Sequence, residues 1–143
     1  MDVMGDLDFL NFDSPVEKGP DSKIKILFVD DEKSILVALR RLCRNTDWDI
    51  YTAESGDEGL AVIAEHTIDL VVSDMRMPKM NGAEFLEQVV KQSPSTVRIL
   101  LTGYSDVAAT IAAIDKGKIF CHCTKPWDND EFREILKEAI ASR

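Results

Sequence analysis

Charged residues follow three short apolar segments of this chain, at the point where each segment ends. They are Asp30 and Asp31 after residues 24–29, Asp74 after residues 69–73, and Lys125 after residues 119–124. A short apolar segment that ends at charged residues predicts a buried strand. If the strand ends meet in space, three carboxylates would form a divalent-metal site with a phosphate-binding ammonium beside it.

The elements that must position these residues alternate between strand-like and helix-like from Lys23 onward. The expected strands are residues 24–29, 48–52, 69–73, 97–101 and 119–124. Each connection is long enough for a crossover helix, as parallel strands require. The chain therefore predicts an α/β fold, a doubly wound (βα)5 unit with a parallel five-stranded sheet. The second strand is the most polar, so we expect it at an edge and the flavodoxin-like order 2-1-3-4-5.

Helix signals fill the connections between these strands. Ser55 and Glu58 have capping-box spacing, and Asp128 precedes the last helix with Glu131 three residues later. Small and branched residues between positions 106 and 116 predict a fourth helix, which Gly117 would end.

The predicted strand order brings the three acidic residues together. In the order 2-1-3-4-5 the first and third strands flank the switch point, where open α/β sheets bind ligands at their carboxyl ends. Oxygen ligands with room for water suit Mg²⁺ or Mn²⁺ better than zinc. As an alternative, residues 30–32 would only cap the next helix. We expect one of these acids to cap that helix, but a second adjacent acid is then unexplained and Asp74 begins no helix, which favours the metal site.

Asp74 is also a candidate nucleophile. A carboxylate accepts a phosphoryl group to form an acyl phosphate, and the protein mainly positions the groups and neutralises charge. Lys125 would contact a phosphoryl oxygen, and Thr102 offers a hydroxyl group at the same edge.

Five motifs in order resemble the receiver domain of two-component response regulators, over roughly residues 23 to 142. They are VDDE at 29–32, SDMRMP at 73–78, NG at 81–82, LTGY at 101–104 and TKPW at 124–127. LTGY at 101–104 together with KPWD at 125–128 is also similar to receivers of HD-GYP phosphodiesterase regulators and of some hydrogenase-regulating transcription activators.

This resemblance implies roles in metal binding. Asp74 would be the phosphoacceptor. Asp31 and Asp74 would bind Mg²⁺ directly, together with the backbone carbonyl of Arg76, whereas Asp30 would act through a bound water.

The resemblance also implies how the phosphoryl group is received and read out. A sensor histidine kinase or histidine phosphotransfer protein would donate it, Lys125 and Thr102 would contact it, and the Lys125–Pro126 peptide bond would be cis. Residues 106–116, 119–124 and 128–142 would then change their affinity for an output domain or a second copy. Such a protein is a switch with self-catalysed phosphoryl transfer and slow autodephosphorylation, not a turnover enzyme.

His122 departs from this family pattern. Three residues before the lysine the family usually has Tyr or Phe, whose ring turns inward when the threonine moves. His122 would be either a weaker switch residue or a strand histidine with no switching role.

Composition limits the other functions. The net charge is −9, and residues 1–22 hold six acidic residues against one lysine, which predicts a flexible acidic leader before a domain at 23–143. An acidic chain without a basic stripe is a poor candidate for direct nucleic-acid binding. We find no apolar run of membrane-spanning length and no signal segment, and therefore expect a cytoplasmic protein that does not bind a membrane.

Two alternative classes remain. A phosphohydrolase with an aspartyl nucleophile would place another Asp two residues after Asp74, where this chain has Arg76. A receiver-shaped interaction module that needs no phosphate usually lacks one of the metal acids, the acceptor or the lysine, and all of these are present here.

Overall fold

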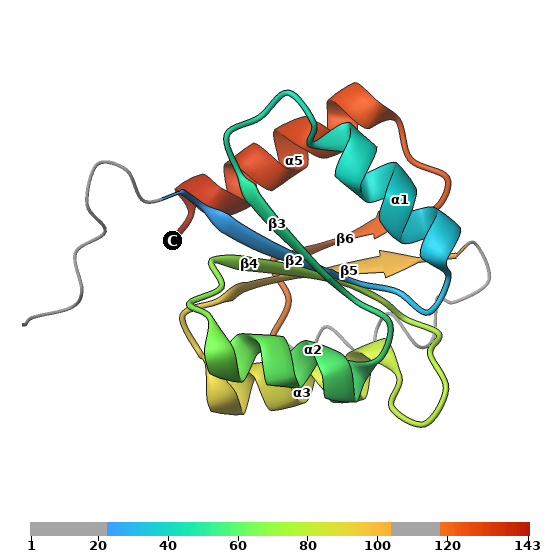
Figure 1. Cartoon of the computed structure of the whole chain (residues 1–143), viewed down its shortest axis with the longest axis vertical. Helices are drawn as coiled ribbons and strands as arrows, with labels where there is room; N and C mark the ends of the chain where they lie inside the picture. Colours follow the sequence, from blue (N-terminus) through green and yellow to red (C-terminus); the bar gives the residue numbers. More distant parts are fainter. Residues whose placement is uncertain (1–22, 104–117) are drawn as a thin grey trace, which may run out of the picture.

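Five parallel strands form the centre of the computed structural model, which describes residues 23–103 and 118–143. They are β2 (Lys25–Val29), β3 (Asp49–Ala53), β4 (Leu70–Asp74), β5 (Val97–Thr102) and β6 (Cys121–Thr124). Their order is β3-β2-β4-β5-β6 (Figure 1), which in chain order is the predicted 2-1-3-4-5. The polar second strand, β3, lies at an edge, as its composition predicts.

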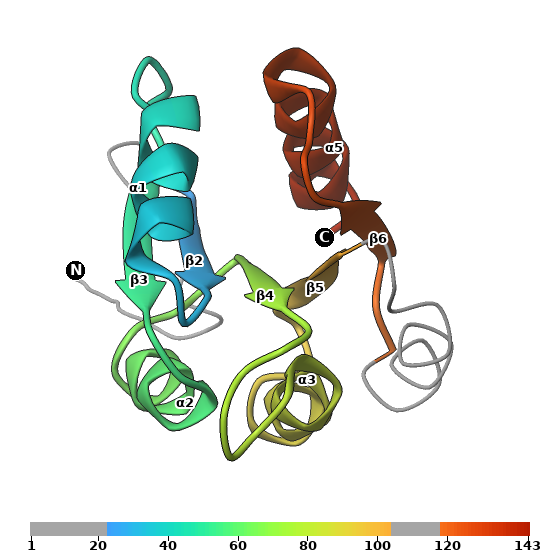
Figure 2. The ribbon, with the colours of Figure 1, turned by 90° about the vertical axis from the view of Figure 1, so that its right-hand side faces the viewer.

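Helices cover both faces of this sheet. They are α1 (Lys33–Leu42), α2 (Gly56–Glu65), α3 (Gly82–Gln92) and α5 (Asn129–Ala141). Figure 2 shows α1 and α5 on one face and α2 and α3 on the other. The strands β2 and β4 alternate their side chains between two buried clusters: Ile26 and Phe28 pack toward α1 and α5, and Leu27 and Val29 pack toward α2 and α3. The predicted doubly wound fold is confirmed.

The helix caps follow the sequence signals at two of the three expected positions. The Ser55 hydroxyl accepts a hydrogen bond from the Glu58 amide at 3.1 Å, and the Asp128 carboxylate accepts one from the Glu131 amide at 2.9 Å. At α1 the expectation that an acid of residues 30–32 caps the helix is wrong. Glu32 occupies the N-cap position without a side-chain hydrogen bond to the helix, and the Asp30 carboxylate accepts a hydrogen bond from the Glu32 amide at 2.9 Å.

Two predicted segments, the leader at 1–22 and the fourth helix at 106–116, lie outside the described residues. Within the described part of the chain, every helix is too short or too polar to cross a membrane.

Candidate functional site

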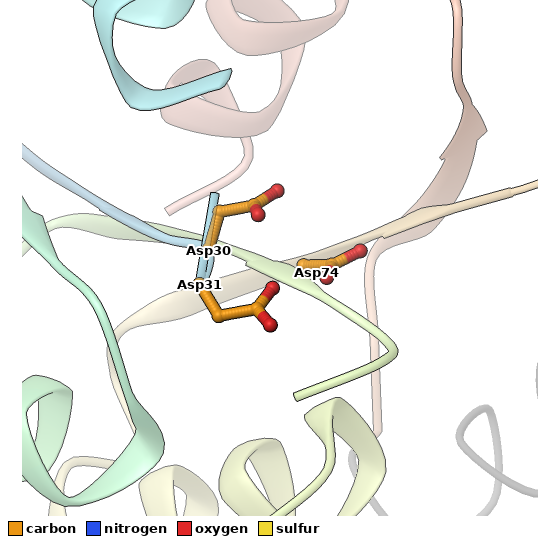
Figure 3. Close-up of side chains that lie close together, drawn as sticks. All are labelled: Asp30, Asp31 and Asp74. Atoms are coloured by element: carbon orange, nitrogen blue, oxygen red, sulfur yellow. The ribbon is translucent and has the colours of Figure 1, made fainter. Parts of the chain in front are cut away.

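The carboxylates of Asp30, Asp31 and Asp74 converge at the carboxyl ends of two neighbouring strands. One oxygen from each lies within 4.8 Å of the others, and Figure 3 shows the three side chains directed into the same space. Parallel pairing of β2 with β4 sets Val29 opposite Ser73, so Asp30 and Asp74 each follow a paired residue at the same level of the sheet. The strand pairing therefore assembles the predicted cluster.

Lys125 joins this cluster from the end of β6. Its ammonium group lies 3.0 Å from an Asp30 oxygen and 2.9 Å from an Asp74 oxygen. The backbone supports this position, because the Lys125 amide donates to the Thr102 carbonyl at 2.8 Å. The Lys125–Pro126 peptide bond is cis, as the sequence resemblance predicts.

The charges of the site are unbalanced. Burial raises the pKa of the Asp74 carboxyl group above its usual value, the hydrogen bond from Lys125 opposes this, and the Asp30 and Asp31 carboxylates raise the pKa further. Burial also opposes the charge of Lys125, but its hydrogen bonds to Asp74 and Asp30 outweigh that effect and raise its pKa. Three carboxylates facing one ammonium group leave a net negative charge that a bound cation would neutralise.

Asp30 and Asp31 occupy different environments although they are adjacent in sequence. The Asp30 side chain is 1% exposed, and its two oxygens accept hydrogen bonds from the Glu32 amide and from Lys125. Asp31 is exposed, and its carboxylate has no hydrogen-bond partner among the described residues. Asp31 therefore presents free oxygens to a cation, whereas those of Asp30 are already engaged. The donor set fits a hard, oxygen-binding divalent cation.

Thr102 lies at the same edge, at the end of β5, and is 2% exposed. Its hydroxyl group donates to the Cys123 carbonyl at 3.4 Å, so in this state it bonds to β6. His122 is exposed, on the opposite face of β6 from Cys121 and Cys123, which belong to the cluster under α1 and α5.

Gly82 supports the acceptor in a way that sequence reasoning missed. Its amide donates to the Met75 carbonyl at 2.8 Å, which draws the start of α3 against the end of β4. A Cβ atom at Gly82 would overlap the Asp74 carbonyl oxygen and lie 2.9 Å from the Met75 Cα. The NG motif at 81–82 also has a structural role. Asn81 in fact begins α3 with a capping box, exchanging hydrogen bonds with Glu84, both at 2.9 Å.

Comparisons with known proteins agree with this geometry. The family model for the response regulator receiver domain matches residues 26–137. The hydrogenase transcriptional regulatory protein HoxA of Cupriavidus necator is 32% identical over 86% of this chain and 25% of its own length. The transcriptional regulator NtrC of Salmonella typhimurium is 36% identical over 79% of this chain and 24% of its own length.

A solved structure extends the comparison to three dimensions. The signal receiver domain of an HD domain-containing protein from Pseudomonas fluorescens Pf-5 is 34% identical and superposes with a TM-score of 0.82, covering 85% of this chain and 97% of that one. The resemblance to receivers of HD-type and hydrogenase regulators is thus confirmed.

The fold and the acidic edge define a phosphorelay receiver of the two-component class. The chain belongs to the response regulator receiver domain family. It spans about a quarter of the length of the curated regulators that it matches. Receiver domains of response regulators are generally non-enzymatic switches, and they bind Mg²⁺ at an acidic pocket.

Proposed function

We propose that this chain accepts a phosphoryl group on Asp74 in a Mg²⁺-dependent reaction, from a sensor histidine kinase or a histidine phosphotransfer protein. The observation that supports this most is the position of Asp74. It is 6% exposed and forms an ion pair with Lys125 at 2.9 Å. One of its oxygens lies within 4.8 Å of an oxygen of Asp30 and an oxygen of Asp31. A buried carboxylate with an ammonium and two further oxygen ligands beside it suits acyl-phosphate formation.

In the proposed step an Asp74 oxygen attacks phosphorus and the bond from phosphorus to the donor imidazole nitrogen breaks. The electron pair of that bond stays on the imidazole, which then takes a proton. Lys125 releases Asp74 and binds a phosphoryl oxygen, because its ammonium group already lies within hydrogen-bond reach of the Asp74 carboxylate that receives the phosphoryl group. A divalent cation, held by Asp31, Asp74 and the Arg76 carbonyl with Asp30 acting through water, would neutralise charge on the transferred group. Slow attack by water on the acyl phosphate would reset the switch.

The readout would pass through Thr102. Its hydroxyl group bonds to β6 in the present state, and a phosphoryl oxygen on Asp74 offers it an alternative acceptor. The surface of residues 106–116, 119–124 and 128–142 would then change its affinity for an output domain or for a second copy, as a symmetric dimer. Because the matched regulators are more than three times as long as this chain, we propose that this receiver controls such an output in the cytoplasm.

The experiment is fluorine NMR with beryllofluoride, a mimic of the bound phosphoryl group. Wild-type protein with Mg²⁺ should give a protein-bound fluorine resonance that disappears when Mg²⁺ is chelated. Asp74→Asn should give none. The matched control Asp47→Asn, at an exposed aspartate outside the cluster, should behave as wild type. A bound resonance that persists in Asp74→Asn would refute the assignment.

A further inference from the structure

A cationic pocket interrupts the otherwise acidic chain, far from the aspartate cluster. It lies between the end of α1, the segment that leads to β3, and α5, and has a volume of about 690 Å³. Arg41, Arg133 and Lys137 line it together with Trp48, and Asp47 is the one acidic side chain in its lining. Figure 1 shows this segment arching from α1 past α5 before it enters β3.

Two of the three cationic side chains of this pocket have acidic partners, and the third has none among the described residues. Arg133 donates to the Leu42 carbonyl at 3.2 Å and to Asp130 at 2.9 Å, and Lys137 pairs with Glu134 at 3.2 Å. Arg41 is exposed, and its guanidinium group has no hydrogen-bond or ion-pair partner among the described residues. Trp48 is half-buried against the cluster under α1 and α5. The pocket therefore combines an aromatic surface with available cations, a setting that suits an acidic segment with aromatic side chains.

The chain itself brings such a segment to this place. The Ile24 carbonyl accepts a hydrogen bond from the Asp49 amide at 2.8 Å, so the described chain begins beside Trp48. Upstream, residues 1–22 carry six acidic residues against one lysine and contain the sequence Asp-Phe-Leu-Asn-Phe-Asp at 8–13. Eleven Cα–Cα steps lead from Phe12 to Lys23, and a random coil of that length has a root-mean-square span of roughly 18 Å.

We propose that residues 8–13 dock in this pocket within the same molecule. The rings of Phe9 and Phe12 would pack against Trp48, and the flanking carboxylates of Asp8 and Asp13 would face the pocket cations. Exposed ion pairs contribute little binding energy, so the segment alone would bind weakly. The tether compensates, because a short flexible linker supplies an effective concentration on the order of 1 mM. This contact is independent of the phosphoryl chemistry at Asp74, since the pocket lies at the opposite end of α1 from Asp30.

The test is NMR of the full chain, using the Trp48 indole and backbone N–H resonances as reporters. The Trp48 amide donates to the Thr46 hydroxyl at 3.3 Å and so also reports amide exchange in the pocket wall. Phe9→Ser/Phe12→Ser should shift the indole resonance and speed Trp48 amide exchange roughly tenfold, as expected if the leader protects the wall in most molecules. Arg41→Glu/Lys137→Glu should shift the indole resonance likewise, and so should raising salt to about 0.5 M in the wild type.

Matched controls separate this docking from other effects. Val3→Ser/Met4→Ser removes apolar side chains from the same leader, and Lys79→Glu/Lys91→Glu reverses two exposed charges away from the pocket. Both should leave Trp48 unchanged. The proposal is overturned if Phe9→Ser/Phe12→Ser leaves Trp48 unchanged, or if Val3→Ser/Met4→Ser shifts it equally. A shift that grows with protein concentration would also overturn it, because the occupant would then be a second copy.

Discussion

At the scale of single residues, the three carboxylates of the site carry more negative charge than the single Lys125 ammonium group can neutralise. Asp30 and Asp74 share one ammonium group, and the exposed Asp31 has no partner among the described residues. A cation that binds this cluster only in the folded state raises the free energy of unfolding, so folding is linked to metal binding. Two predictions follow from the different surroundings of the three carboxylates.

Replacing the acceptor should stabilise the metal-free protein. Burial raises the pKa of Asp74 in the folded state, so the folded protein binds a proton more tightly than the unfolded chain does. The free energy of unfolding therefore falls as pH rises from about 3.9, the usual Asp pKa, through the raised value, and stays lowered at neutral pH. Asp74→Asn removes this effect and should raise the free energy of unfolding by on the order of 1 kcal/mol.

Urea unfolding at pH 7 with EDTA measures this difference. Asp47→Asn, at an exposed position outside the cluster, should change little. Adding Mg²⁺ should stabilise the wild type and narrow the gap to Asp74→Asn. A less stable Asp74→Asn in EDTA would contradict this account of the charges.

The two adjacent acids should contribute unequally to Mg²⁺ affinity. Asp31 has free oxygens, whereas both Asp30 oxygens accept protein hydrogen bonds. Asp31→Ala should abolish measurable Mg²⁺ binding, and Asp30→Ala should weaken it by roughly tenfold, as the loss of an outer-shell partner does. Tryptophan fluorescence reports the titration through Trp127, two residues after Lys125. Equal losses in the two variants would exclude this division of roles.

At the scale of elements, the contact between β4 and α3 holds the acceptor in place. No side chain fits at Gly82, because a Cβ atom there would overlap the Asp74 carbonyl oxygen. Gly82→Ala should lower the free energy of unfolding by about 1–3 kcal/mol, the usual cost of overpacking, and should also weaken Mg²⁺ binding by displacing Asp74. Denaturant unfolding and the fluorescence titration check the two effects. Gln88→Ala, on the exposed side of α3, is the control and should be nearly neutral. Unchanged stability of Gly82→Ala would show that α3 can move away from β4.

The pair β5 and β6 should carry the response to phosphorylation. Thr102 must give up its hydrogen bond to the Cys123 carbonyl to reach a phosphoryl oxygen. Beryllofluoride should therefore speed or slow amide exchange at residues 119–124 in the wild type, and Thr102→Ala should lose that response while still binding beryllofluoride. Because the ring of His122 is polar, we expect a smaller response than in His122→Tyr. Binding without any change at 119–124 in the wild type would refute this route.

At the scale of the whole molecule, most of the architecture could be predicted from the sequence. The strand order followed from the alternation of strands and helices and from the polar second strand, and the convergence of Asp30, Asp31 and Asp74 followed from that order. Contacts between segments that are distant in the sequence could not be predicted in this way. The overlap at Gly82 depends on how closely α3 approaches β4, and the ion pair of Arg143 with Asp69 at 2.7 Å joins the end of α5 to the start of β4. No local pattern encodes such approaches.

The pocket at the far end of α1 belongs to the same scale. Its cations come from two helices, and Trp48 comes from the segment before β3, so only the folded chain assembles them. The sequence alone therefore does not reveal this pocket.

The central claim is that Asp74 accepts a phosphoryl group with the help of a divalent cation. Intact-protein mass spectrometry after incubation with acetyl phosphate tests it most directly. Wild-type protein with Mg²⁺ should gain the mass of one phosphoryl group, and the same sample with EDTA should gain none. Asp74→Ala should gain none with Mg²⁺, whereas Asp47→Ala should match the wild type. An undiminished phosphoryl adduct in Asp74→Ala would contradict the account.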